Sequence, residues 1–383
     1  RGLDWEYQCL HGMGETLYDE VVGADALNRP CRVYAPVGTH ETLLAYLVRR
    51  LLENGANSSF VNRLVDPAVS VDELAADQVA LAERHGGAPY GRIPLPADLY
   101  APERRNSKGL DLASEDDLRW LDEGLPPGPW TAAPLLAGRA YDPGNGAPVR
   151  NPADHADQIG TVREATTDEV EHALAAAASA APGWAATEPF ERAACLERTA
   201  DLMEAELCQL IALAVREAGK TLPNAVGEVR EAVDFCRYYA ARIRAEFDNR
   251  THKGLGPVVC IAPWNFPLAI FTGEVAAALA AGNTVLAKPA EQTPLIATAA
   301  VRLFHRAGVP EGVLQLLPGN GATVGATLVA DPRVQGVVFT GSTEVALLIN
   351  RKLAERGGDT VLIAETGGQN AMIVDSTALT EQV

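Results

Sequence analysis

An asparagine and a glutamate have the surroundings that best suit catalysis in this sequence of 383 residues. Asn265 lies in the segment PWNFP, residues 263–267, where two prolines around an aromatic residue and an amide make a rigid loop. Its side-chain N–H could stabilise a negative oxygen that develops during a reaction, as an oxyanion donor does. On the residues alone, a proline-fixed turn with a buried Trp264 remains an alternative.

Glu365 follows an apolar run and precedes two glycines. We expect it to end a buried strand and, as a carboxyl group in apolar surroundings, to act as a general base. The alternative is a structural role, in which the side chain caps the chain or accepts a hydrogen bond from the glycine loop.

Two further segments have residue types that suit a dinucleotide. Lys288 ends an apolar run and Glu291 follows three residues later, so the pair would hold ribose hydroxyl groups or form a surface ion pair. Gly341 and Ser342 lie between a predicted strand and a predicted helix, where backbone N–H groups and the hydroxyl suit a pyrophosphate. A serine at this position is also an ordinary N-cap, so both interpretations stay open.

A third glycine segment resembles a dinucleotide fingerprint only approximately. Gly319, Gly321 and Gly325 have the spacing G-x-G-x-x-x-G, one residue longer than G-x-G-x-x-G. We therefore favour a strand-to-helix turn in which glycine supplies a positive φ.

The elements that must position these residues alternate along the chain. Apolar runs at 257–262, 284–287, 314–317, 337–339 and 361–364 predict buried parallel strands. Helices are predicted between them at 268–281 and 294–307, and around 345–353. This alternation indicates a parallel, doubly wound α/β sheet, in which ligands bind at the carboxyl ends of the strands. Each of the segments named above falls at such an end.

Upstream of the sheet we predict two long helices. Thr166 and Glu169 form a capping box that opens a helix ending near Pro182. Residues 192–218 have an apolar stripe at helical spacing that predicts a single helix with Gly219 as its C-cap.

The N-terminal region predicts a strand at 33–37 and a helix at 40–54, capped by Thr39 and closed by Gly55. Tyr46, Arg49, Arg50 and Glu53 share one stripe of this helix. The spacing favours a solvated face with an Arg49–Glu53 ion pair, but adjacent arginines also suit a carboxylate ligand. The opposite stripe is apolar and contains Leu43, Leu44, Leu47, Val48, Leu51 and Leu52.

Composition narrows the classes of function. The net charge of −18 argues against nonspecific binding of nucleic acid, which needs a basic surface. Six scattered cysteines without a C-x-x-C pair argue against a disulfide framework or a zinc or other metal site and fit a reducing cytoplasm. No run of about 18 apolar residues is present to span a membrane. We expect three regions: residues 1–88, a proline-rich linker at 89–130 with a short helix at 114–123, and an α/β region at 131–383.

As an ordered set, these segments of residues 131–383 resemble the cofactor half of an aldehyde dehydrogenase. The resemblance implies a Rossmann-type NAD-binding domain, with Asn265 as oxyanion donor, Glu365 as base, Lys288 and Glu291 on the adenosine ribose, and Ser342 near the pyrophosphate. It also implies a cysteine nucleophile, hydride transfer to NAD and a thioester that water hydrolyses. The implied NAD contacts are Ile261, Pro263, Trp264, Asn265, Lys288, Glu291, Gly321, Phe339, Gly341 and Ser342.

The chain departs from that family in one respect. Every cysteine lies at or before Cys260, which we expect in a buried strand, and none takes the place of the nucleophile. We therefore expect the catalytic domain to lie outside this chain and both ends to be cuts within a longer protein.

The N-terminal segments 10–14, 34–38 and 46–55 resemble the C-terminal end of the proline dehydrogenase barrel in the bacterial proline utilization A family. The resemblance implies part of a distorted (β/α)8 barrel that carries FAD. Arg49 and Arg50 would bind the proline carboxylate, and Glu53 would lie near the flavin. The implied pocket lining is Leu10, Tyr34 and Tyr46.

Together the resemblances imply two consecutive oxidations. Proline would be oxidised with FAD to Δ1-pyrroline-5-carboxylate, which opens to glutamate semialdehyde, and the latter would be oxidised to glutamate with NAD. A full-length relative would be a cytoplasmic homo-oligomer with a peripheral contact to membrane quinones, and the chain itself would have neither activity. The alternatives are a stand-alone NAD-dependent aldehyde dehydrogenase with an N-terminal extension and a non-catalytic NAD-binding protein.

Overall fold

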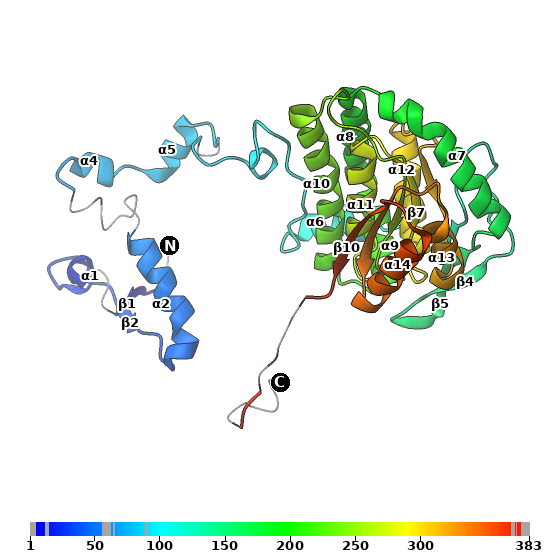
Figure 1. The fold of residues 1–383 in the computed structure, drawn as a ribbon. Coiled ribbons are helices and arrows are strands. Elements are labelled where there is room, and N and C mark those ends of the chain that lie inside the picture. Colours follow the sequence, from blue (N-terminus) through cyan, green and yellow to red (C-terminus); the bar gives the residue numbers. More distant parts are fainter. Residues whose placement is uncertain are drawn as a thin grey trace. The chain divides into compact units, whose positions relative to one another are not determined.

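The computed structural model describes residues 5–11, 15–55, 63, 66–88, 91–368, 372 and 374–376, without the side chains of residues 15, 16, 47, 51 and 53–55. The chain divides into two compact units, Arg1–Arg92 and Ile93–Val383 (Figure 1). The limits expected at residues 88 and 130 stay predictions.

The first unit contains two consecutive strand–helix pairs. Strands β1 (Tyr7–Leu10) and β2 (Cys31–Tyr34) pair in parallel, and helices α1 (Glu15–Val22) and α2 (His40–Gly55) follow them. Two short helices come next, α4 (Val71–Leu74) and α5 (Gln78–Arg84). The strand expected at 33–37 lies earlier because Pro36 has no N–H for the ladder and disfavours its continuation. Parallel strands with intervening helices are the repeating unit of a (β/α)8 barrel.

The second unit is built on a five-stranded parallel sheet, as predicted. Its strands are β6 (Pro257–Ile261), β7 (Thr284–Lys288), β8 (Leu314–Leu316), β9 (Gly336–Gly341) and β10 (Val361–Thr366). The spatial order is β10-β9-β6-β7-β8, and every pairing is parallel. The order reverses direction between β6 and β9, and this switch point is where doubly wound sheets bind ligands.

Helices cover both faces of this sheet, so its strands are apolar on both sides. Val258 and Cys260 of β6 belong to one core cluster and Val259 belongs to the other, because successive side chains of a strand point to opposite faces. The first cluster includes α8 (Pro189–Ala205), α9 (Leu207–Ala218), α10 (Leu222–Glu246), α11 (Ala269–Ala280) and α12 (Pro294–Arg306). The second includes α7 (Thr167–Ala186), α13 (Ala326–Ala330) and α14 (Thr343–Arg356). Figure 1 shows α8 and α10 side by side.

Two predictions about helix limits are wrong. Helix α7 continues past Pro182 to Ala186, because Trp184 is buried and donates a hydrogen bond to the Leu279 carbonyl at 3.0 Å. Residues 192–218 form two helices, and Glu206, at φ −102° and ψ 26°, separates them. The apolar stripe in the sequence does not show this break, because both helices pack against the same core. The capping box of Thr166 and the left-handed C-cap at Gly219 are confirmed.

The segment that precedes the five-stranded sheet packs against the helices of the second unit. The short helix predicted at 114–123 is α6 (Glu115–Gly124), which Ser114 caps. Asp234 of α10 accepts hydrogen bonds from Arg104 and Ser107, so part of the proline-rich segment is anchored to the second unit. A three-stranded sheet has the order β3 (Trp130–Ala132), β5 (Asp154–Val162), β4 (Ala147–Asn151). Within the described residues, no helix has the length and apolar character needed to cross a membrane.

Candidate functional site

A groove of about 1490 Å³ runs along the carboxyl ends of β6, β7, β9 and β10. It collects every residue that the sequence predicts for the NAD site, together with the predicted base. The groove lies at the switch point of the sheet, where loops from neighbouring strands face each other. These lining residues are Ile261, Pro263, Trp264, Asn265, Lys288, Glu291, Gly321, Phe339, Gly341, Ser342 and Glu365.

The loop that carries Asn265 is exposed to the groove. Trp264 is 57% exposed, so the alternative of a turn around a buried tryptophan is wrong. Asn265 is also exposed, which leaves its amide accessible to a ligand in the groove. The prolines restrict the backbone on both sides of the amide, but apolar burial does not hold its side chain.

Lys288 is 4% exposed, which excludes the surface ion pair that we considered. Its Nζ donates a hydrogen bond to the carbonyl of Pro289 at 3.0 Å. Burial lowers the pKa of Lys288, and the nearby carboxylates of Glu291 and Glu164 act in the opposite direction. A partly desolvated ammonium beside a groove is a strong donor for a ligand hydroxyl group.

Glu291 joins two loops of the groove. Its Oε1 accepts a hydrogen bond from the backbone N–H of Gly321 at 2.7 Å, although the two residues belong to different strand–helix connections. A Cβ atom on Gly321 would lie 3.6 Å from Glu291 Oε1, and one on Gly325 would lie 3.5 Å from Lys288 Cδ. Glycine at both positions therefore keeps the space beside Lys288 and Glu291 open, which fits a dinucleotide ribose.

At the end of β9, Ser342 caps α14 by accepting a hydrogen bond from the Val345 N–H at 3.2 Å. The hydroxyl is thus an N-cap, and the helix start remains a site with an affinity for anions. Gly341 has no room for a side chain, because a Cβ atom would lie 2.6 Å from Cζ of the buried Phe339. The turn at Gly341 therefore packs directly against the ring of Phe339.

Glu365 does not end a buried strand, and that expectation is wrong. It lies within β10, an edge strand of the described sheet, and its side chain is exposed. Glu365 pairs in register with Thr340 of β9 and still faces the groove. The apolar sequence of β10 resembles that of the central strands, so the sequence contains no signal for this difference.

A third carboxyl group in the groove, beside Glu291 and Glu365, escaped the sequence analysis. Glu274 of α11 is 7% exposed, and its Oε1 accepts a hydrogen bond from the Thr340 hydroxyl at 2.7 Å. Burial raises its pKa well above the usual value, and the hydrogen bond from Thr340 acts in the opposite direction. One acidic residue in an otherwise apolar helix was the signal that would have identified it. Phe235 and Tyr239 of α10, a helix we did not predict, also line the groove.

Cys260 confirms the expectation of a core residue. It is fully buried in β6, and burial raises the pKa of its thiol. A neutral, enclosed thiol is a poor nucleophile. Cys31, Cys195, Cys208, Cys236 and Cys260 are free thiols.

Two pairs of candidate residues lie together in the described part of the first unit. Leu10 and Tyr34 are register partners at the carboxyl ends of β1 and β2. On α2, the Arg50 guanidinium lies over the Tyr46 ring at 5.3 Å from its centroid. The side chain of Glu53 is outside the described atoms, and so is the proposed Arg49–Glu53 ion pair.

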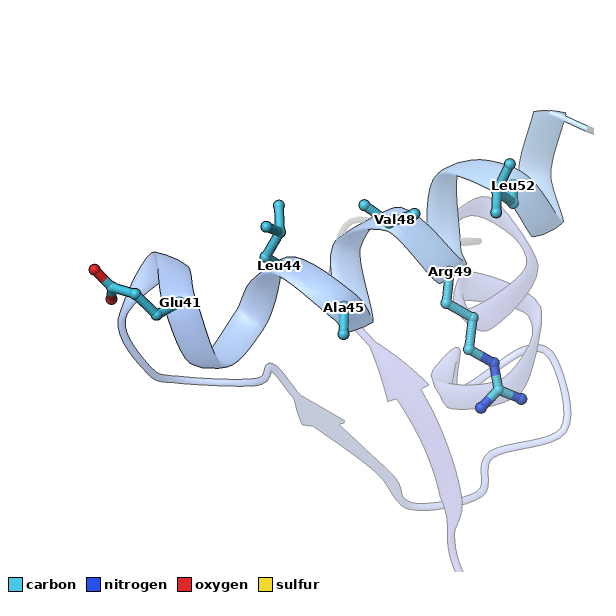
Figure 2. A pocket seen from close by; sticks show the side chains of 6 residues that line it. All are labelled: Glu41, Leu44, Ala45, Val48, Arg49 and Leu52. Atoms are coloured by element: carbon cyan, nitrogen blue, oxygen red, sulfur yellow. The ribbon is translucent and has the colours of Figure 1, made fainter. Parts of the chain in front are cut away.

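Three residues of the apolar stripe of α2, Leu44, Val48 and Leu52, are exposed within this unit. Figure 2 shows a shallow pocket along the helix, with Leu44, Val48 and Leu52 directed away from the two strands and Arg49 directed toward the other side. Tyr34 is 51% exposed at the end of β2. The described part of this unit therefore presents these residues without enclosing a site.

Two family models match the chain in succession. The proline dehydrogenase model matches residues 1–63, and the aldehyde dehydrogenase family model matches residues 141–383. The chain belongs to the aldehyde dehydrogenase family. This agrees with the order of the segments at the carboxyl ends of β6, β7, β9 and β10.

The chain is 61% identical to the bifunctional protein PutA of Escherichia coli (strain K12) in an alignment of 395 residues. The alignment covers 99% of this chain and 30% of that protein. Its fold is similar to the crystal structure of a mutant of Bradyrhizobium japonicum proline utilization A, with a TM-score of 0.78, 48% identity and coverage of 98% of this chain and 37% of the other. A 1-pyrroline-5-carboxylate dehydrogenase from Thermus with bound NAD has a TM-score of 0.63 and 34% identity, over 69% of this chain and 55% of the other. The chain thus spans about a third of the length of the bifunctional relatives.

Proposed function

We propose that residues 93–383 bind NAD as the cofactor half of a dehydrogenase for glutamate semialdehyde. The observation that carries this proposal is the groove at the switch point, which gathers the predicted cofactor residues from four strand ends. Similarity to a 1-pyrroline-5-carboxylate dehydrogenase with bound NAD supports the choice of cofactor and aldehyde.

Three residues of the groove have defined roles in NAD binding in this proposal. Lys288 donates a hydrogen bond to a ribose hydroxyl group, and Glu291 accepts one. The N-terminus of α14, with Ser342, stabilises the pyrophosphate. NAD accepts a hydride from the substrate when it is bound.

The catalytic groups that line the groove follow β6 (Asn265) and lie within β10 (Glu365). Asn265 donates its amide N–H to the oxygen that becomes negative when the aldehyde is attacked by a nucleophile outside this chain. Glu365 accepts a proton as the general base, and its exposed position on β10 gives water access to the carboxylate.

We propose that the first unit belongs to a proline-oxidising domain that holds FAD. Its match to the proline dehydrogenase family and the parallel β1–β2 pair support this assignment. Arg49 and Arg50 would bind the carboxylate of proline, with Arg50 held against Tyr46. Leu10 and Tyr34 would line the same pocket from the strand ends, and Glu53 would lie beside the flavin.

In the full-length protein, the two domains would oxidise proline and then glutamate semialdehyde in sequence. We propose a homo-oligomer in the cytoplasm, where cysteine thiols stay reduced, with a peripheral contact to membrane quinones. A stand-alone aldehyde dehydrogenase would not explain why residues 1–63 match the proline dehydrogenase family.

Calorimetric titration of the isolated chain with NAD tests the cofactor assignment. We expect weak binding, without oxidation of proline or aldehyde by the chain alone. Binding that is unaffected by Lys288→Met would contradict the proposed site. Measurable aldehyde oxidation by the chain would overturn the view that its nucleophile lies elsewhere. A full-length protein without either activity would favour the non-catalytic alternative.

A further inference from the structure

The loop with Asn265 is followed by a helix whose first N–H groups are bound by a buried carboxylate. The backbone N–H groups of Leu268 and Ala269 both donate to Oε1 of Glu228, each at 3.0 Å. Glu228 lies on α10 and is 1% exposed. The start of α11 has no intrahelical acceptors for these N–H groups, and a negative charge there is favoured by the helix dipole. Glu228 thus fixes the chain immediately after the PWNFP loop.

A lysine connects this carboxylate to the loop itself. Nζ of Lys220 lies 2.9 Å from Oε2 of Glu228 and 4.0 Å from the centroid of the Phe266 ring. Phe266 is the neighbour of Asn265 in sequence. The side chains of Lys220 and Glu228 are 14% and 0% exposed, so water screens their ion pair little.

The backbone of Lys220 is held in place as well. It follows the left-handed C-cap Gly219, and its N–H donates to the Ala214 carbonyl at 3.2 Å. Helix α10 begins two residues later and carries Glu228. The ammonium and the carboxylate therefore both extend from a fixed junction between α9 and α10.

We propose that Lys220 and Glu228 are positioning residues that set the orientation of the Asn265 amide. This inference rests on the proposed role of Asn265 as oxyanion donor. The loop needs such support because Trp264, Asn265 and Phe266 are all exposed, so packing does not determine its geometry. Neither positioning residue is among those lining the groove. A displacement of about 1 Å at a catalytic group lowers rates by about 100-fold, so the alignment matters even though neither residue touches the substrate.

Glu217 offers a matched control in the same chain. From α9 it accepts hydrogen bonds from the N–H groups of Leu295 and Ile296, at 2.7 and 2.8 Å, at the start of α12. It therefore makes the same kind of cap on the helix that follows Lys288 and Glu291. Among the described residues, it has no ion-pair partner and no link to the loop of Asn265.

A double-mutant cycle in the full-length protein tests the inference. Lys220→Met and Glu228→Gln are each made alone and in combination with Asn265→Ala, and kcat and KM for aldehyde oxidation are measured. With Asn265 present, we expect each variant to lower kcat about tenfold while the KM values for aldehyde and NAD change by less than about twofold. With Asn265→Ala, the same substitutions are expected to change kcat by less than about twofold, because the group they orient is gone.

The outcomes separate this inference from the proposed function. If Asn265→Ala leaves kcat unchanged, the oxyanion role fails, and the positioning role fails with it. If Asn265→Ala lowers kcat but Lys220→Met has no effect, or has an equal effect in both backgrounds, only the positioning role is wrong. Glu217→Gln should act equally in both backgrounds. Lys220→Met decides the matter if Glu228→Gln does not fold, because Lys220 is not itself a helix cap.

Discussion

The two units of this chain differ in how far they assemble the residues that the sequence marks for chemistry. In residues 93–383, loops that are more than a hundred residues apart in sequence meet in one groove. In the described part of residues 1–92, the marked residues that lie together are the pairs Leu10–Tyr34 and Tyr46–Arg50. A five-stranded parallel sheet aligns five carboxyl ends at one edge, whereas a pair of strands aligns two. Among the described residues, the groove of the second unit therefore follows from the shared carboxyl edge of its strands.

The largest effect should come from Asn265→Ala in the full-length protein. We expect kcat for aldehyde oxidation to fall by about 10²–10³, the usual effect of removing an oxyanion donor, with KM for NAD little changed. Steady-state kinetics measure this directly. Asn145→Ala, at an exposed turn outside the groove, is the control and should be neutral. A fall in NAD affinity without a fall in kcat would make Asn265 a cofactor ligand instead.

Arg50→Ala tests whether the first unit contributes a carboxylate site. We expect kcat/KM for proline oxidation to fall by about 100-fold, because a desolvated carboxylate would lose its charged partner. Arg84→Ala, an exposed arginine of the same unit, serves as the control. Equal effects of the two substitutions would mean that Arg50 contributes only to the general charge of the unit. The first unit would then contain no carboxylate site at Arg50 to compare with the groove of the second unit.

Lys288→Met should weaken NAD binding to this chain by about tenfold, since a hydrogen bond from a charged donor contributes about 1.5–3 kcal/mol. The temperature of unfolding should not fall, because burial already disfavours the ammonium, as its lowered pKa indicates. Calorimetric titration and thermal unfolding check the two parts. The exposed Lys253→Met is the matched control. A large loss of stability with unchanged affinity would assign Lys288 to the core alone.

The smallest effect concerns stability. Burial raises the pKa of Glu217 from 4.5 to about 8, although the two hydrogen bonds that it accepts from backbone N–H groups favour the charged form. Between these values the folded protein holds a proton that the unfolded chain releases, so the free energy of unfolding should decrease as pH rises from about 4.5 to 8. Glu217→Gln removes this contribution, about 1.4 kcal/mol per pH unit at most.

Urea unfolding of the second unit at several pH values measures this slope. The variant and the parent share Glu274, whose raised pKa acts in the same direction, so its contribution cancels in the comparison. Identical slopes for the two proteins would show that Glu217 is ionised in the folded state.

Much of the second unit was predictable because its physical determinants are local. The apolar run of residues 257–262 predicts a strand buried on both faces, and β6 has that environment. Local patterns could not predict that α7 continues past Pro182, since this depends on the hydrogen bond from Trp184 to the distant Leu279 carbonyl. The break at Glu206 has no signal in the apolar stripe, which continues through both helices. The same limit applies to Glu274, whose partner Thr340 belongs to another strand.

The sequence by itself determined which segments form strands and which residue types stand at their ends, because periodicity and backbone chemistry act over a few residues. It also determined the family, through the order of those segments. Only the tertiary structure decided that β10 is an exposed edge, that Lys288 is buried, and that Glu291 holds the Gly321 loop. It alone connected Lys220 and Glu228 to the loop of Asn265. Burial, desolvation and hydrogen bonding between loops depend on strand order in space, and strand order is a property of the whole sheet.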